Sequence, residues 1–353
     1  MRVLVATGCT SGLGSIALSQ FLSRLISNSQ SQSQSWLILA GYRSTHPPRL
    51  ETFNKTVELK WLQLDLANFE SVNQFAHMVK QELHSRGLNK VDTLLLNAAV
   101  WKAQFEPVQL GEKQYSKEAL VKHFAQYYLT QELLPLLSAT PSSEERSRII
   151  FTTSSLQNSV QSLDDLLPLL TSSLTPQTSS KARYAASKLL QTISYHSLHQ
   201  QLTSNNPSSS SSAKDHGVVD IVSVSPGFVP TTGLARETSW WQRLFMRYII
   251  SWAPFCTSEE EGAKRIVDCI TLPIAELESN PSLSSDSSDS TTSRFLFQPS
   301  QDSSNNASLN QLLAQLKGGE EEGAKKEWEE LKKVWMPSLK EMRSWAENRE
   351  VTE

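Results

Sequence analysis

The sequence predicts a doubly wound α/β domain, in which helices cover both faces of a parallel sheet. Short apolar runs alternate along the chain with stretches of helical periodicity, and each run is typical of a strand buried on both faces. Parallel pairing with crossover helices packs such an alternation most economically. The predicted strands are residues 3–6, 36–40, 61–64, 93–96, 148–152 and 218–224, with 294–298 as a further edge strand.

Composition excludes several classes of protein. The chain has 353 residues, of which 39% are hydrophobic and 20% charged, enough to bury a substantial core. Its 33 basic and 36 acidic residues give a formal charge of -3, so no general attraction to nucleic acid is expected. The three cysteines lack the spacing of a zinc site or a disulfide framework. We therefore expect a reducing compartment and no bound metal.

Segments rich in Ser, Gln and Asn interrupt the pattern at 28–35, 204–212 and 279–293. Each falls between predicted elements, which favours surface loops inserted into one domain of residues 1–300. The first residues carry no charged leader and no apolar span, so we expect folding to begin at about residue 2 and a cytoplasmic location.

The pattern of the remaining residues, 301–353, predicts an amphipathic helical extension that is broken at Pro337. We expect its apolar stripe to pack on the protein's own surface, with a partner or membrane contact as the alternative. The stripe consists of Trp328, Leu331, Trp335, Leu339, Met342 and Trp345.

A glycine-rich turn follows the first predicted strand and opens a helical run over 15–26. Glycines allow a tight turn and close approach of the backbone to a pyrophosphate, and the helix N-terminus offers amide donors. The position between strand and helix favours dinucleotide binding over an ordinary turn. The expected phosphate-binding residues are Gly8, Thr10, Ser11, Gly12, Leu13 and Gly14.

Three further residues follow predicted strands and suit a dinucleotide. Arg43 comes after the second strand, where an acidic residue would bind the ribose of NAD, so NADP(H) is favoured over NAD. Asp65 follows the third strand and is a candidate for the adenine amino group, and Asn97 follows the fourth. The alternatives are a surface arginine and turn or capping roles for Asp65 and Asn97.

A second constellation has the chemistry of proton transfer. Tyr184 and Lys188 are four residues apart on a predicted helix over 185–202, which places phenol and ammonium on one face. A nearby ammonium favours the phenolate and brings a pKa of about 10 toward the working range. Ser155, after the fifth strand, is a candidate for binding a substrate carbonyl; polar residues closing a strand are the alternative.

Together these motifs resemble the short-chain dehydrogenases/reductases, which have a Rossmann fold. The resemblance covers roughly residues 1–275 and rests on the glycine turn, Asp65, Asn97, Ser155, Tyr184, Lys188 and the segment 225–231, all in the family's order. It implies that Ser155 polarises the carbonyl, that Tyr184 exchanges the proton, and that Lys188 lowers the tyrosine pKa and holds the nicotinamide ribose. It also implies that the nicotinamide side is lined by Pro226, Gly227, Val229 and Thr231.

One position departs from the family. Lys122 stands where members usually carry an asparagine that anchors a water of the proton relay. Within the family, the chain is most similar to protochlorophyllide-reductase-like and retinol-dehydrogenase-like members. Leu190 and Phe228 replace the cysteines of the light-driven enzymes, so we do not expect a photoenzyme. An insertion containing 163–166 also resembles, loosely, membrane-associated 3-ketosteroid reductases.

The segment at about 233–256 is expected to form a lid over the substrate. Its aromatic residues at helical spacing suit a bulky lipophilic carbonyl compound or alcohol, or else only pack the lid on the domain. Arg243 and Arg247 leave a membrane-surface role open. His196 and His199 lack a third ligand and are expected to be ordinary core or surface residues.

We therefore expect NADP(H)-dependent hydride transfer to or from a lipophilic carbonyl or alcohol, with reduction favoured. The alternatives are a sterol-synthesis reductase peripheral to the endoplasmic reticulum or lipid droplets, and a non-catalytic NADP-binding scaffold. The sequence predicts no particular oligomeric state.

Overall fold

The computed structural model describes residues 1–28, 34–49, 56–137, 146–160, 166–171, 179–204, 219–227, 229, 257–278, 284–285, 295–298 and 332–347. Within these ranges, eight strands form one sheet in the order β3-β2-β1-β4-β7-β8-β10-β9, and all neighbours except β10 and β9 are parallel. The strands are β1 (Arg2–Thr7), β2 (Trp36–Tyr42), β3 (Val57–Gln63), β4 (Thr93–Leu96), β7 (Ser147–Thr152), β8 (Val219–Val224), β9 (Ser284–Ser285) and β10 (Phe295–Gln298).

The doubly wound sheet is therefore confirmed, with changes at β3 and at its end. β3 begins at Val57, four residues before the predicted start, and only Val57 and Leu62 of its side chains are buried. The run that was expected to be an edge strand forms β10, but β9 pairs antiparallel on its outer side. Consequently β10 lies inside the sheet, between β8 and β9. Position 218, the expected start of β8, lies outside the described residues.

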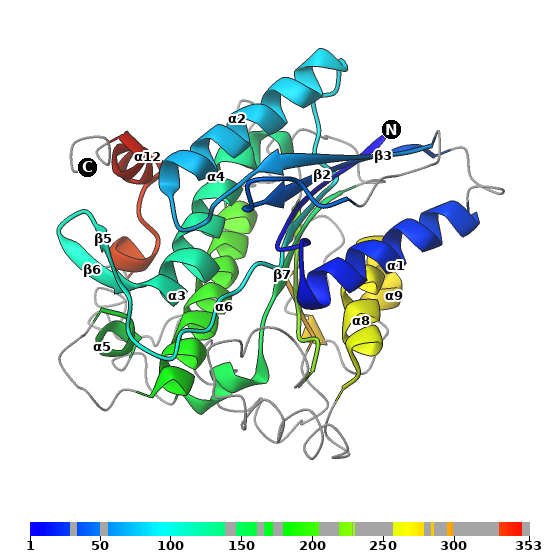
Figure 1. The fold of residues 1–353 in the computed structure, drawn as a ribbon. Helices are drawn as coiled ribbons and strands as arrows, with labels where there is room; N and C mark the ends of the chain where they lie inside the picture. Colours follow the sequence, from blue (N-terminus) through cyan, green and yellow to red (C-terminus); the bar gives the residue numbers. More distant parts are fainter. Residues whose placement is uncertain are drawn as a thin grey trace.

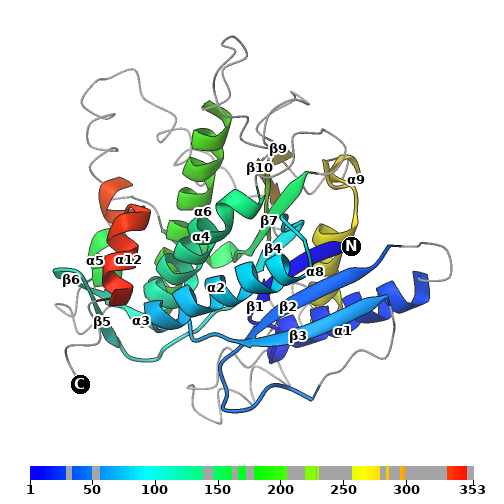
Figure 2. The ribbon, with the colours of Figure 1, turned by 90° about the horizontal axis from the view of Figure 1, so that it is seen from above.

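Helices cover both faces of the sheet (Figure 1). One face carries α1 (Gly12–Asn28), α8 (Glu259–Thr271) and α9 (Ile274–Glu278), and the other carries α2 (Phe69–Ser85), α4 (Ala125–Leu137) and α6 (Ser180–Ser204). The two layers are also separate when the molecule is seen from above (Figure 2). Side chains of β1 alternate between the two cores, as the strand period of two requires: Val3 and Val5 belong to one, Leu4 and Ala6 to the other.

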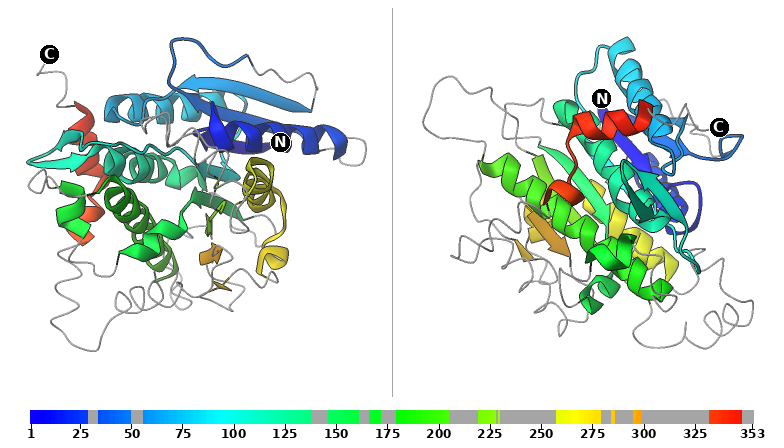
Figure 3. Two further views of the ribbon diagram at one scale, coloured as in Figure 1. Left: turned by 60° about the horizontal axis from the view of Figure 1, so that its bottom comes forward. Right: turned by 90° about the vertical axis from the view of Figure 1, so that its left-hand side faces the viewer.

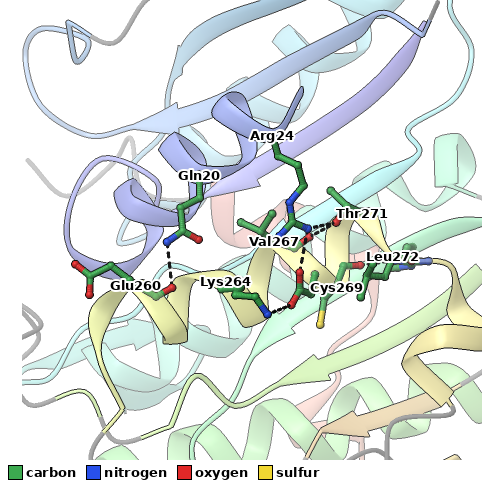
Figure 4. A network of polar contacts seen from close by, with 10 residues as sticks. Gln20, Arg24, Glu260, Lys264, Val267, Cys269, Thr271 and Leu272 are labelled. Carbon is green, nitrogen blue, oxygen red and sulfur yellow. Dashed lines mark hydrogen bonds and ion pairs between the residues drawn. The ribbon is translucent and has the colours of Figure 1, made fainter. Parts of the chain in front are cut away.

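Polar contacts join α8 to α1 and to the sheet (Figure 4). Arg24 Nη1 donates to Asp268 Oδ1 at 2.9 Å and to Thr271 Oγ1 at 2.7 Å, and Gln20 Nε2 donates to the Glu260 carbonyl at 3.0 Å. From β7, the half-buried Arg148 donates to the carbonyl of Leu272 at 3.1 Å. These bonds fix α8 beside the helix that begins at the glycine turn.

Helix α6 is buried on all sides, since every residue from 183 to 199 is buried. It carries the predicted Tyr184 and Lys188 as well as His196 and His199. Both histidines are therefore core residues, as expected. No group of three metal-binding side chains occurs in the described part of the chain.

Several small elements are absent from the sequence-based prediction. A hairpin of β5 (Pro107–Leu110) and β6 (Lys113–Ser116) precedes α3 (Lys117–Ala119), and a π-helical turn, η1 (Leu120–Phe124), joins α3 to α4. The 3₁₀ turn η2 (Ser155–Ser159) follows β7, and α5 (Leu166–Thr171) lies before α6.

The C-terminal segment 332–347 packs on the domain, as expected for its apolar stripe. A helical turn at 332–335 ends before Pro337, and α12 (Leu339–Glu347) lies against α2 and α4 (Figure 3). Trp335 and Met342 are buried, and Trp345 meets Phe69 edge-on at 5.5 Å. Positions 301–331, with the rest of the stripe, lie outside the described residues.

Charged contacts hold the same segment. The buried Glu132 on α4 accepts from Arg343 Nε and from Lys80 Nζ, each at 2.6 Å.

None of the helices in the described ranges combines the length and the apolar character that crossing a bilayer requires.

His123 gives this docking a pH dependence. Its buried Nε2 lies 2.6 Å from the Trp335 carbonyl, and burial lowers its pKa to about 4. The native pKa is below the unfolded value of about 6.5, so the stability contributed by neutral His123 is present above that value and is lost as the pH falls toward 4. We predict a loss of roughly 3 kcal/mol over this window from this residue.

Urea unfolding at several pH values between 4 and 7 measures this loss. His123→Gln keeps an amide donor for the Trp335 carbonyl but does not titrate, so its stability should fall less steeply than that of wild type. Equal slopes for the two proteins would contradict the prediction.

Candidate active site

The carboxyl ends of β1, β4 and β7 are tied together by Asn97. Its Nδ2 donates to the Gly8 carbonyl at 2.9 Å, and its Oδ1 accepts from Thr152 Oγ1 at 3.0 Å. Its backbone N–H and that of Ala98 donate to Thr7 Oγ1 at 3.2 and 3.3 Å. Ligands bind at the carboxyl ends of strands in open α/β sheets, and these bonds give that edge a fixed shape.

The glycine turn is shaped as a phosphate cradle. Gly8 and Gly12 have φ of 70° and 55°, which favour glycine. A Cβ on Gly8 would lie 2.5 Å from Ala98 Cα, and one on Gly14 would lie 2.0 Å from the Gly8 carbonyl oxygen. The turn therefore packs directly on the strand ends while the N-terminus of α1 presents backbone amides.

The residues of this turn thus fit the pyrophosphate of a dinucleotide. Thr10 and Ser11 are exposed at its rim. Leu13 points toward α8, where its Cδ1 would be 3.2 Å from a Cβ on Gly262.

Of the two predicted adenosine contacts, Arg43 is exposed directly after β2. Asp65 is partly occupied with its own turn: its Oδ1 accepts from Ala67 N at 2.9 Å, and its backbone N–H donates to Ser71 Oγ at 2.8 Å. The turn role is therefore present, and the role toward adenine stays a prediction.

The segment after β8 lies against the start of α8. Gly227 has a φ of 87°, and a Cβ there would lie 2.1 Å from Thr257 Oγ1. A Cβ on Gly262 would lie 3.0 Å from the Pro226 carbonyl oxygen and 3.2 Å from Val229 Cγ2. Pro226, Gly227 and Val229 are thus brought to the same edge as Leu13. Thr231 and the lid at 233–256 lie outside the described residues and stay predictions.

Tyr184 is a buried phenol held by three neighbours. Its side chain is hydrogen-bonded to that of Ser154, its ring stacks on Trp101 with centroids 4.8 Å apart, and Lys122 Nζ lies 3.6 Å from the ring centroid. Burial raises the pKa of Tyr184 well above its usual value, and the hydrogen bond from Ser154 opposes this in part.

Ser154, and not the predicted Ser155, lies beside this phenol. Ser154 is extended, with φ of -153° and ψ of 140°, and successive residues of extended chain point to opposite sides. Ser154 therefore faces Tyr184, whereas Ser155 begins η2 and is exposed.

Lys188 lies one helical turn beyond Tyr184, on the same helix as predicted. Its Nζ donates to the carbonyl of Thr152 and, at 3.0 Å, to Gln191 Oε1. Burial lowers the pKa of Lys188 to about 7, so that the amine is half protonated near neutral pH.

Sequence reasoning missed Trp101 and the contact between Lys122 and Tyr184. A large aromatic residue four positions after Asn97 was a signal for Trp101, because the chain there leaves a strand end at the binding edge. The position of Lys122 was noted, but the sequence does not show what its amine touches.

Comparison with known proteins agrees with this fold. No protein-family model matches the chain. It is 30% identical over 280 residues to the short-chain dehydrogenase/reductase GME11359 of Pestalotiopsis microspora, covering 77% of this chain and 84% of that protein. It is also 32% identical over 90 residues to the short chain dehydrogenase yanD of Aspergillus niger, covering 26% of this chain and 25% of that protein.

Among solved structures, the KRED1-Pglu enzyme is similar with 16% identity and a TM-score of 0.49, covering 77% of this chain and 95% of that one. The relative from Pestalotiopsis microspora spans most of both sequences. The chain therefore belongs to the short-chain dehydrogenases/reductases, a family of oxidoreductases that act on CH–OH and C=O groups.

We predict that Gly14→Ala weakens binding of NADPH at least about tenfold, which corresponds to about 1.4 kcal/mol. The added Cβ would overlap the Gly8 carbonyl and displace the cradle. Isothermal titration calorimetry of the folded variant measures the effect, with Ser19→Ala on the exposed side of α1 as the control. Unchanged affinity of Gly14→Ala would show that the cofactor does not use this turn.

Proposed function

We propose that the protein is an NADP(H)-dependent oxidoreductase that transfers hydride between the nicotinamide and a carbonyl or secondary alcohol of a bulky lipophilic substrate, with reduction favoured. One observation carries the proposal: a buried phenol, Tyr184, lies beside the Ser154 hydroxyl at the sheet edge that also holds the glycine cradle.

The chain's own residues supply binding and proton transfer. Bound at this edge, a nicotinamide cofactor would supply or accept the hydride. Ser154 and Tyr184 offer two hydroxyl donors to one carbonyl oxygen, which stabilises the charge that develops there. Tyr184 then gives its proton to that oxygen as a general acid. The phenolate of Tyr184 then remains. Lys188 has a pKa near 7, and its protonated form stabilises this phenolate.

The finer parts of the proposal have separate support. Arg43 follows β2 with an exposed guanidinium, a group suited to bidentate pairing with a 2′-phosphate. The half-buried indole of Trp101 beside Tyr184 supplies an apolar wall next to the proton donor, which suits a lipophilic substrate. Reduction is the favoured direction because cells keep NADP mainly reduced.

We predict that Tyr184→Phe retains NADPH binding but loses at least about 100-fold in kcat, because Phe cannot donate a proton. The assay follows NADPH oxidation at 340 nm with steroid, retinoid and aromatic ketones, including 9,10-phenanthrenequinone. Ser154→Ala should also lose activity, whereas the exposed neighbour Ser155→Ala should keep it.

Full activity of Tyr184→Phe would overturn the proposed mechanism. Tight NADPH binding without turnover of any compound in the panel would favour the non-catalytic scaffold instead.

We further predict that Arg43→Glu lowers the affinity for NADPH roughly tenfold to a hundredfold but does not lower that for NADH, because a carboxylate after β2 can accept from the ribose hydroxyl of NADH. A charge-assisted hydrogen bond contributes about 1.5–3 kcal/mol, and only NADPH carries the 2′-phosphate. Calorimetry with both cofactors measures the ratio. Arg49→Glu changes the same charge at another exposed position of this loop and serves as the control. Equal losses for both cofactors would argue against this role of Arg43.

A further inference from the structure

A second lysine reaches the proton donor. Lys122 lies in the π-helical turn η1, and its side chain is fully buried. Its Nζ lies 3.6 Å from the centroid of the Tyr184 ring. The same Nζ donates to Ser187 Oγ at 2.9 Å, and Ser187 Oγ donates to the Tyr184 carbonyl at 2.7 Å. The amine is therefore fixed against both the ring and the backbone of Tyr184.

The turn that carries Lys122 is itself unusual. π-helical turns are rare and occur frequently at functional sites, since one residue more per turn re-aims the side chains. The next residue, His123, contacts the Trp335 carbonyl. The same turn therefore places Lys122 against the Tyr184 ring and His123 against the C-terminal segment.

Charged groups of both signs surround Lys122. Among the described residues, three act on its amine: Glu118 from α3, and Arg183 and Lys188 from α6. Glu118 Oε1 already lies 3.7 Å from Arg183 Nε and accepts from the backbone N–H of Lys102 at 3.3 Å. Arg183 and Glu118 offset one another, so a further negative charge nearby would favour the protonated form of either buried amine.

A phenolate at Tyr184 is the group that can provide this charge. A cation over an aromatic face is attracted by the ring, and more so when the surroundings are dry. Lys122 satisfies this geometry from above the ring, while Lys188 lies one helical turn further along α6.

We propose that Lys122 is a positioning residue that acts with Lys188 to stabilise the phenolate form of Tyr184. This inference rests on the proposed role of Tyr184 as the proton donor. The charges of the two lysines depend on each other. Burial lowers the pKa of Lys122 well below its usual range, and the charge of Lys188 lowers it further. The negative charge of Glu118 acts in the opposite direction. When Tyr184 ionises, a protonated amine against its ring becomes favourable.

The consequence is a pH profile that depends on Lys122. In the direction of reduction, Tyr184 must be protonated, so kcat falls as the pH rises through its pKa. Lys122→Met removes the amine at nearly constant length, which should raise that pKa. We expect the alkaline limb of kcat, measured with NADPH and 9,10-phenanthrenequinone, to move to higher pH by about one unit. Lys113→Met, at an exposed position of β6, should leave the profile unchanged.

The outcomes separate this inference from the proposed function. If Tyr184→Phe is inactive and Lys122→Met shifts the limb, both are supported. If Tyr184→Phe is inactive but the limb of Lys122→Met coincides with that of wild type, the inference about Lys122 is wrong and the proposed function stands. An active Tyr184→Phe enzyme would overturn the proposed function, and the inference with it.

A second measurement does not require turnover. Thermal unfolding of Lys122→Met, Tyr184→Leu and the double variant tests whether the amine and the ring interact in the folded protein. We expect the shift in Tm of the double variant to differ from the sum of the single shifts by at least about 2 °C. Additive shifts would overturn the inference even if wild type does not reduce the quinone.

Discussion

The hydrogen bonds of the Asn97 side chain are the constraint on which the rest of the site depends. One end of this amide holds the Gly8 carbonyl of the phosphate cradle, and the other accepts the Thr152 hydroxyl. The carbonyl of the same Thr152 accepts from Lys188. A continuous chain of bonds therefore joins the expected pyrophosphate site to the proton-transfer residues. A shift of one strand end would change the position of both.

Burial controls the chemistry of the residues that this chain of bonds places. Tyr184 and Lys188 lie on a helix that is covered on all sides, and burial disfavours the charged form of each. The pKa of the phenol rises while that of the amine falls, so the pair is most stable when neutral. Ionising one group alone is unfavourable, and charges of opposite sign stabilise one another when they form together. The acid-base behaviour of Tyr184 thus belongs to a cluster that includes Lys122 and Lys188.

Much of the fold and the site could be predicted from the sequence, because its strongest signals are local. Apolar runs marked the buried strands, and glycines marked a turn where a Cβ would overlap the backbone. The four-residue spacing placed Tyr184 and Lys188 on one helix. The sequence predicted Ser155 at the place that Ser154 takes beside Tyr184, because adjacent residues of an extended segment face opposite sides and the sequence alone does not give the phase.

Contacts between segments far apart in the chain were also beyond prediction. The stacking of Trp101 on Tyr184 and the approach of Lys122 depend on where α6 passes the ends of β4 and η1. Helical periodicity predicted the apolar stripe of the C-terminal segment, but its place on α2 and α4 depends on pairings such as that of Arg343 with Glu132. Such pairings follow from the tertiary arrangement.

A crystal structure of the protein with bound NADP⁺ tests most directly whether this strand edge is the site of hydride transfer. We expect the pyrophosphate on the backbone amides at the start of α1 and the nicotinamide beside Tyr184 and Ser154, with the Asn97 bonds to Gly8 and Thr152 intact. A cofactor bound away from the glycine turn, or a nicotinamide remote from the Tyr184 hydroxyl, would contradict the assignment of this site.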